Sequence, residues 1–554
     1  MTFNSIEFLL FLPLVLGLYY LTGHKLQNRM LLAASYFFYG WWDVRFLFLI
    51  VISTVIDFVC GLMIARGHVP LKERMLASLY ACAAAFFFMT IPWGEASLFS
   101  SSAPFFHFAK FGSVLATKAD WFPLLATGGV AIVFNLVYSL LAGLSENARR
   151  KTFLWTSVTA NLSILGFFKY FNFFADSLEN ATASLGMDAQ MLRLDIILPV
   201  GISFYTFQTM SYAIDIYRRK LEPTDRFLDF ALFVSYFPQL VAGPIERASA
   251  LLPRILKPRK INYEQITQGS FLILWGLFKK VAIADGVAGA VDSIFLSTGD
   301  VTWADVVLGT ILFAVQIYCD FSGYTDIARG VSKLMGIDLM LNFNQPYFST
   351  NPSEFWRRWH ISLSSWLRDY LYIPLGGSRG GKLLTYRNLM ITMVLGGLWH
   401  GAAWNYILWG FYQGGILCTH MILFGRAKKT ATAEGASRTL AVVKQIALTV
   451  SFFAVTCYGW LLFRAISLDQ VATFTSTLIF DFGELALTIK KPTLAAVAGL
   501  PVLVLYEFAQ YRAKDAEYYE RLIRPARGFL YAAVLFLTCM GMSNDPAQFI
   551  YFQF

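Results

Sequence analysis

The sequence predicts an all-α, polytopic integral membrane protein with roughly 11–14 membrane segments. Of its 554 residues, 57% are hydrophobic and 14% are charged, whereas soluble proteins carry about a quarter of their residues as charges. The apolar residues also form blocks of about 20, the length of a helix that crosses a bilayer, and short charged loops separate these blocks. This composition excludes an intrinsically disordered chain, and six cysteines are too few for a disulfide-rich secreted protein.

The candidate membrane segments follow one another along the whole chain, so residues 1–554 are expected to form a single membrane domain. The first segment, near 4–22, lacks the basic residues and the cleavage site of a signal peptide, and we expect it to be retained. Residues 30–64 and 385–424 are each long enough for two passes. The other segments lie near 76–93, 124–143, 153–176, 195–217, 227–243, 265–290, 304–322, 439–465, 493–509 and 528–543.

The charge of the loops predicts which side of the membrane each one faces. Five loops have more Lys and Arg than Asp and Glu, and such loops stay in the cytoplasm. Residues 94–123 carry equal numbers of basic and acidic residues and are expected to form an exported loop insertion. Residues 507–527 have mixed charge and are expected to form a cytoplasmic amphipathic helix. The five positively charged loops are 65–74, 145–151, 218–226, 244–260 and 425–438.

Several kinds of catalytic chemistry are excluded because their sequence motifs are absent. The chain has no GxxxxGK[ST] phosphate-binding loop, no HExxH zinc motif and no GxSxG nucleophile motif. No cysteines form a CxxC pair, and no Cys/His spacing resembles a zinc site, so we predict neither a metal site nor a bound cofactor. The net charge of +10 indicates basic loops that face anionic membrane lipid, and no nucleic-acid partner is expected.

A polar region begins with QIYCDFSGYTDIARG at 316–330. It contains Asp320 and Asp326, and ionisable groups at membrane depth cost a few kcal/mol each, so they are candidate site residues. The alternative is a structural role, as an Asp–Arg pair with Arg329 or as a helix cap. The residues alone leave both interpretations open.

The next stretch predicts an amphipathic helix across 352–370. Asn351 and Pro352 form a helix-start signal. With 3.6 residues per turn, the side chains divide into an aromatic face and a basic face, and His360 lies at their boundary. Arginines suit the binding of a phosphate-bearing donor such as coenzyme A; the alternative is a helix that rests on lipid headgroups. The aromatic face holds Trp356, Trp359, Leu363, Trp366, Leu367 and Tyr370, and the basic face holds Arg357, Ser364 and Arg368.

A third stretch, LGGLWHGAAWN at 395–405, puts His400 deep in an apolar segment among small residues. Such residues let backbones or a ligand approach closely. A histidine in this setting is either a buried, hydrogen-bonded group or a catalytic base, and the residues alone favour neither.

The two histidine-containing stretches, 355–377 and 395–405, together resemble the membrane-bound O-acyltransferase (MBOAT) family. The resemblance is strongest to its bacterial branch that O-acetylates polysaccharides such as alginate. It extends over nearly the whole chain, and the loop at 94–123 is its main departure. Further matching segments are ASYFFYGWWD (34–43), LVAGPIER (240–247), QIYCDFSGYTDIARG, NFNQPYF (342–348), the group Trp460, Phe463 and Arg464, and FIYFQF (549–554).

The resemblance implies helices around a tunnel that crosses a bacterial cytoplasmic (inner) membrane. It implies that His400 matches the family's near-invariant catalytic histidine and that His360 matches a second one. An acyl thioester, acetyl-CoA or an acyl carrier, would enter from the cytoplasm. An exported SGNH-type acetyltransferase partner would complete the transfer to an extracytoplasmic polysaccharide.

The chemistry implied is acyl transfer from a thioester to a hydroxyl, which needs a base to remove the hydroxyl proton. Neutral His400 suits this role, because burial disfavours the imidazolium. Candidate donors to the developing oxyanion are His360 and Asn405. The expected donor-binding residues are Arg357, Arg358, Arg368, Trp356 and Tyr370, and the expected supporting residues are Asp320, Asp326, Asn405 and Trp399.

Two other functions fit some of these features. One is transfer of D-alanine from a carrier protein to teichoic acid, which uses the same chemistry. The other is a proton-coupled transporter or flippase with Asp320, Asp326 and His400 as a proton relay. The sequence has no inverted repeat of the kind found in many transporters, which argues against the second.

Overall fold

The structure is a computed structural model that describes residues 1–93, 115–187, 191–297, 299–425, 438–483, 485–543 and 547–552. Every regular element in these ranges is a helix, which confirms the predicted all-α class. Most of the predicted exported loop 94–123 and of the predicted cytoplasmic loop 425–438 lies outside the described residues.

The chain folds into two compact units. Unit 1 comprises Met1–Phe171, Asp195–Val241 and Glu246–Lys260, and unit 2 comprises Asn172–Leu194, Ala242–Ile245 and Ile261–Phe554. That residues 1–554 form a single membrane domain stays a prediction.

Six described helices are long and apolar enough to cross a membrane: α3, α6, α15, α19, most of α20, and α22. The total of 11–14 membrane segments stays a prediction. Both segments predicted to hold two passes do contain two helices. Residues 30–64 are divided between α2 and α3, and residues 385–424 between α18 and α19.

Unit 1 is built around a buried polar network that joins three helices. Asp57 on α3 accepts hydrogen bonds from Ser157 and Asn161 on α7, the latter at 2.8 Å, and Thr209 on α9 donates to Asn161 at 3.2 Å. Buried polar groups need such partners, so the network fixes how these helices pack. The helices of unit 1 are α1 (Ile6–Tyr20), α2 (His24–Gly40), α3 (Arg45–Ala65), α4 (Leu71–Ala84), η1 (Ala85–Thr90), α6 (Phe122–Ala142), α7 (Glu146–Leu165), η2 (Gly166–Tyr170), α9 (Ile202–Tyr217), α10 (Phe227–Ser235), α11 (Phe237–Leu240) and α12 (Ala248–Leu256).

Basic loops of unit 1 meet at one end of its helices. Arg150, near the start of α7, donates to the carbonyl oxygens of Ile64 near the end of α3 and Tyr217 at the end of α9. In a similar contact, Nε2 of His24 at the start of α2 lies 2.9 Å from the carbonyl oxygen of Ile255, near the end of α12. Ion pairs of Arg66 with Asp225 and of Arg219 with Glu146 connect three of the predicted cytoplasmic loops directly, 65–74, 145–151 and 218–226.

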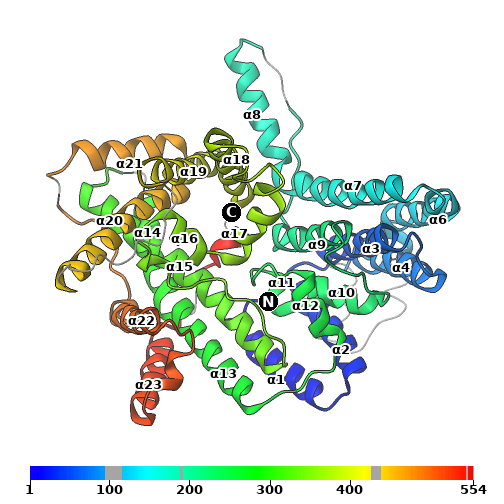
Figure 1. The fold of residues 1–554 in the computed structure, drawn as a ribbon, viewed down its shortest axis with the longest axis horizontal. Coiled ribbons are helices and arrows are strands. Elements are labelled where there is room, and N and C mark those ends of the chain that lie inside the picture. The colour runs from blue at the N-terminus through cyan, green and yellow to red at the C-terminus, as the bar shows by residue number, and fades with distance from the viewer. Residues whose placement is uncertain are drawn as a thin grey trace. The chain divides into compact units, whose positions relative to one another are not determined.

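Unit 2 uses glycine pairs to bring long helices close together. A Cβ added to Gly276 on α13 would lie 2.5 Å from the carbonyl oxygen of Gly323 on α15, and one added to Gly330 would lie equally close to that of Gly269. Only glycine allows this approach, and α13 lies along α15 in Figure 1. The helices of unit 2 are α8 (Phe171–Ser184, whose first residue belongs to unit 1), α13 (Tyr263–Leu277), η3 (Phe278–Ala284), α14 (Asp285–Phe295), α15 (Trp303–Leu334), η4 (Pro346–Phe348), α16 (Pro352–Arg358), α17 (Ile361–Leu367), η5 (Arg368–Tyr372), α18 (Lys382–His400), α19 (Trp404–Phe424), α20 (Arg438–Arg464), α21 (Leu468–Phe480), α22 (Leu494–Ala513), η6 (Tyr518–Arg521), α23 (Arg524–Gly541) and η7 (Ile550–Phe552).

The predicted amphipathic surface helix at 507–527 does not form. Its first residues belong to α22, which ends where Lys514 adopts a left-handed conformation with φ 52°. Glu507 is buried and accepts a hydrogen bond of 2.6 Å from Tyr318, so it does not face solvent. A short helix, η6, and the start of α23 take up the rest of the range. The charge pattern was misleading because a buried partner for Glu507 comes from α15, far away in the sequence.

Candidate active site around two histidines

His400 is the last residue of α18, at the turn into α19, and it is buried. Glycines beside it allow the two helices to approach. A Cβ on Gly397 would lie 2.2 Å from the carbonyl oxygen of Tyr406, and one on Gly401 would lie 2.1 Å from the Tyr406 ring. The glycine-rich motif around the histidine therefore serves helix packing, which holds the imidazole at a fixed position.

Aromatic rings surround the imidazole of His400. The ring centroids of Trp399, Trp409, Phe463 and Tyr551 lie 5.1, 5.2, 5.3 and 6.0 Å from it. These rings come from α18, α19, α20 and the C-terminal segment. Aromatic side chains from four separate segments therefore enclose the imidazole of His400.

His360 interrupts the helix that the sequence predicted across 352–370. The first part, α16, ends at Arg358, and His360 adopts a left-handed conformation with φ 42° and ψ 55° before α17 begins. The start of the predicted helix is confirmed, because the Asn351 side chain caps it and Pro352 occupies its first position. A left-handed residue other than glycine costs on the order of 1 kcal/mol and persists only where its surroundings stabilise it.

Asn342 supplies that stabilisation. Its backbone carbonyl accepts from the N–H of Ile361 at 2.9 Å, and its side-chain Oδ1 accepts from the N–H of Ser362 at 3.2 Å. The same Oδ1 lies 3.2 Å from Nδ1 of His360. In the tautomer in which Nδ1 donates to this oxygen, Nε2 of neutral His360 is the acceptor nitrogen. In that tautomer Nε2 of His360 is suited to accept a proton.

Two aromatic side chains connect the two histidines. The Trp399 ring lies 6.1 Å from His360 and 5.1 Å from His400, and the Tyr551 ring lies 6.5 and 6.0 Å from them. The structure thus brings both predicted catalytic residues and the predicted supporting residue Trp399 into one site.

Asp320 holds the C-terminal segment against this site. Its Oδ2 accepts from the N–H of Ile550 at 2.7 Å, and its Oδ1 pairs with Lys280 at 2.9 Å. Lys280 also donates to the carbonyl of Ala547 at 3.0 Å. These bonds position Tyr551, and Figure 1 shows the red C-terminal segment beside α17. Asp320 is therefore a positioning residue. The role of Tyr551 was missed because the FIYFQF motif by itself carries no sign of which residues it contacts.

Asp326 has the structural role that the sequence left open. It pairs with Lys279 at 2.5 Å and with Arg329 at 3.4 Å, and Lys279 also donates to Ser322. A half-buried carboxylate paired in this way contributes to helix packing between η3 and α15.

Asn405 is likewise engaged in structure. Its side-chain nitrogen donates to the carbonyl oxygens of Phe463 at 3.3 Å and Ala465 at 2.9 Å. Both amide hydrogens are therefore used to hold α19 against the end of α20. This arrangement argues against the oxyanion contact expected from the sequence and for a supporting role.

The predicted donor-binding residues do not form one surface. Arg358 pairs with Glu354 at 3.1 Å and donates to the carbonyl of Asn344, so it holds α16 in place. Arg357 and Arg368 are exposed, but they lie on opposite sides of the break at His360, and Arg368 pairs with Asp369. The common face predicted for these arginines assumed a continuous helix. The two aromatic residues in the predicted set pack on other rings, Trp356 on Trp409 and Tyr370 on Trp366.

Comparison with known proteins identifies the family. The model of the MBOAT, membrane-bound O-acyltransferase family matches residues 222–463. The probable alginate O-acetylase AlgI of Pseudomonas aeruginosa is 38% identical to this chain, and the match covers 87% of this chain and 75% of AlgI. The probable alginate O-acetylase AlgI of Azotobacter vinelandii is 36% identical, and the match covers 91% of this chain and 83% of that protein. The peptidoglycan O-acetyltransferase of Helicobacter pylori is 37% identical over 64% and 69%. This chain therefore belongs to the MBOAT family and is a multi-pass membrane O-acyltransferase.

Proposed function

We propose that this acyltransferase moves an acetyl group from acetyl-CoA in the cytoplasm across a bacterial inner membrane, for O-acetylation of an extracytoplasmic polysaccharide. The observation that carries the proposal is the meeting of His360 and His400 in one aromatic site, in a chain similar to enzymes named for alginate and peptidoglycan O-acetylation. Both of those polymers offer sugar hydroxyls as acceptors.

In the proposed reaction, His400 acts as the general base. It removes the proton of an acceptor hydroxyl as the oxygen attacks the thioester carbonyl, so that a C–O bond forms. The C–S bond of the tetrahedral intermediate then breaks, and the imidazolium of His400 returns the proton to the departing thiolate. His360 accepts a hydrogen bond through Nε2, which suits orientation of the hydroxyl or of the thiol that leaves.

The route of the acetyl group is part of the proposal. The donor enters a tunnel between the helices from the cytoplasm, and the acceptor reaches the site from the other side. The acceptor is a hydroxyl on an exported SGNH-type acetyltransferase partner or on the polysaccharide itself. The donor approaches from the cytoplasmic side of the membrane, which the basic loops face.

The chemistry is tested by release of free coenzyme A from purified protein, measured with a thiol reagent. We expect slow consumption of acetyl-CoA, which increases when a polysaccharide acceptor and the exported partner are added. A D-alanyl carrier protein should not replace acetyl-CoA. No thioester cleavage with any donor, together with substrate accumulation in proteoliposomes, would contradict the proposal in favour of a transporter.

The orientation is tested by labelling a cysteine from one side of sealed right-side-out vesicles. We expect Lys257→Cys to be protected from a membrane-impermeant maleimide until the vesicles are opened. The exposed native Cys539 is replaced by serine in the same protein so that it adds no background. Labelling of Lys257→Cys in intact vesicles would overturn the predicted orientation.

A further inference from the structure

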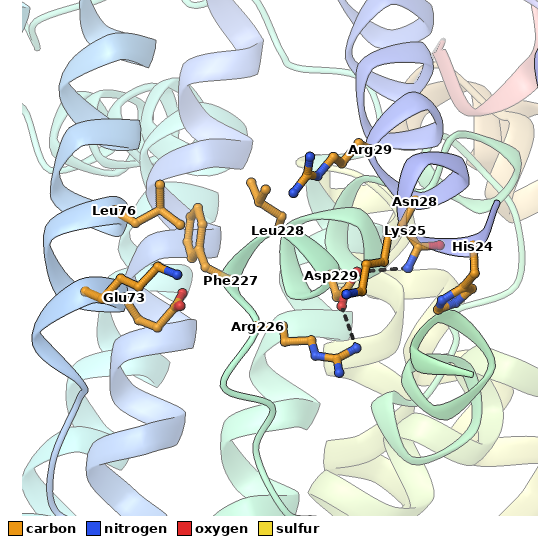
Figure 2. Close-up of a pocket in the computed structure, with 11 residues that line it drawn as sticks. His24, Lys25, Asn28, Arg29, Glu73, Leu76, Arg226, Phe227, Leu228 and Asp229 are labelled. Atoms are coloured by element: carbon orange, nitrogen blue, oxygen red, sulfur yellow. Dashed lines mark hydrogen bonds and ion pairs between the residues drawn. The ribbon is translucent and has the colours of Figure 1, made fainter. Parts of the chain in front are cut away.

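A cleft of about 460 Å³ opens at the end of unit 1 where the basic loops meet. It is lined by the first turns of α2, α4 and α10, as Figure 2 shows. Lys25 and Arg29, one turn apart on α2, line it on one side, and Glu73 of α4 lies on the other side. Lys72 of α4 also belongs to the lining. All residues that line this cleft belong to unit 1, and none of them is a residue of the candidate active site.

The cleft has an excess of positive charge that the described part of the chain does not neutralise. Of its carboxylates, Asp229 pairs with Arg226 at 3.7 Å and accepts from Asn28 at 2.8 Å. Lys25, Arg29 and Lys72 form no ion pair or hydrogen bond with any described residue, and Glu73 is the remaining carboxylate of the lining. The side chains therefore favour an anion.

The backbone adds to this preference. The helices α2, α4 and α10 all begin at the cleft, and within the described residues none of the three has a side-chain hydrogen bond at its N-cap. In contrast, α13 and α15 of unit 2 both begin with a reciprocal capping box. Uncapped first-turn N–H groups carry partial positive charge and bind phosphate readily.

Exposed leucines stand close in sequence to the lining residues, which bears on the source of a phosphate. Leu26 and Leu71 are next to Lys25 and Lys72 and are 55% and 63% exposed, and Leu79, three residues after the lining residue Leu76, is 67% exposed. In a membrane protein such side chains contact acyl chains. A soluble nucleotide would gain no binding energy from these leucines. A phospholipid would bind the basic residues through its phosphate and the leucines through its acyl chains.

We propose that this cleft binds one anionic phospholipid of the leaflet that faces the basic loops. The headgroup phosphate lies among Lys25, Arg29 and Lys72 and the three helix N-termini, and the acyl chains lie along the exposed leucines of α2 and α4. Basic pockets at the ends of membrane helices bind anionic headgroups through the same combination of charge and apolar contact.

The test measures lipid binding by native mass spectrometry of the full-length protein with phosphatidylglycerol and with phosphatidylcholine. The pocket variant carries Lys25→Gln, Arg29→Gln and Lys72→Gln. The control variant carries Lys151→Gln, Lys220→Gln and Lys257→Gln, which removes the same charge from exposed positions outside the cleft. A basic residue near a membrane surface contributes enough that loss of three should weaken binding on the order of 100-fold.

We expect the pocket variant to lose one tightly held phosphatidylglycerol, while the control variant retains it and phosphatidylcholine binding stays equal in all three proteins. Leu76→Trp, which fills the cleft and keeps every charge, should cause the same loss. Equal phosphatidylglycerol binding by the pocket and control variants would overturn the proposal. So would displacement of the lipid by soluble adenosine diphosphate, because the cleft would then be a nucleotide site. Neither result depends on acyl transfer.

Discussion

His400 ends a regular helix, whereas His360 lies at a break between two short ones. His400 is held by packing, because glycines on α18 let Tyr406 approach and aromatic rings enclose the imidazole. His360 is held by hydrogen bonds that Asn342 makes to the backbone and to Nδ1. The two histidines should therefore be sensitive to different substitutions. Added side-chain volume should displace His400, and loss of a hydrogen-bonding group should displace His360.

The largest effect is expected from removal of the base itself. His400→Ala should lower acyl transfer by about 10²–10⁴-fold while the protein stays folded, since loss of a general base typically costs that much. The measurement is release of coenzyme A at matched protein levels. His420→Ala, on α19 and outside the aromatic site, is the control and should keep normal turnover. Normal turnover in His400→Ala would remove this residue from the mechanism.

Activity should also depend on Asn342, which hydrogen-bonds His360. Asn342→Ala should lower kcat by about 100-fold, because the imidazole of His360 loses its orientation and a misplacement of about 1 Å can cost that factor. Asn344→Ala is the control, since in the described structure Asn344 bonds Arg358 only through backbone atoms. If Asn342→Ala and Asn344→Ala have the same kcat, His360 needs no such orientation.

The packing around His400 should instead be sensitive to added side-chain volume at Gly397. Gly397→Ala should destabilise the protein by about 1–3 kcal/mol, because overpacking forces α18 and α19 apart. Thermal unfolding in detergent measures the change. Gly415→Ala on α19 is the control, because a Cβ there meets no atom within 4 Å. A melting temperature for Gly397→Ala equal to that of Gly415→Ala would mean that the α18–α19 contact is looser than the structure has it.

The smallest effect concerns the exposed arginines beside the break. If Arg357 and Arg368 contact donor phosphates, the variants Arg357→Gln and Arg368→Gln should each raise KM for acetyl-CoA several-fold and leave kcat unchanged, as loss of uniform binding does. The defect should disappear with a short thioester that lacks the nucleotide. An equal defect with both donors would exclude these arginines from donor binding. Because they lie on separate helices, their effects should also be independent.

Much of the fold follows from local sequence. Apolar blocks of membrane length predicted the helices, and 30–64 and 385–424 each hold the expected pair. Asn351 and Pro352 marked the start of α16, because capping involves only residues within one turn. His400 was selected as a candidate catalytic residue through the family resemblance, since its glycine-rich apolar surroundings alone favoured neither a structural nor a catalytic role. Each of these signals depends on residues close together in the chain.

Other features depended on contacts that no local pattern encodes. The left-handed turn at His360 exists because Asn342 bonds the backbone beyond it, and the regular spacing of 352–370 had predicted a continuous helix instead. Tyr551 reaches both histidines because Asp320, some two hundred residues earlier in the chain, binds the backbone of Ile550. Sequence spacing determines which residues share a helix face. Only the tertiary structure decides which distant polar groups meet, and a buried polar group must find such a partner to avoid the cost of desolvation.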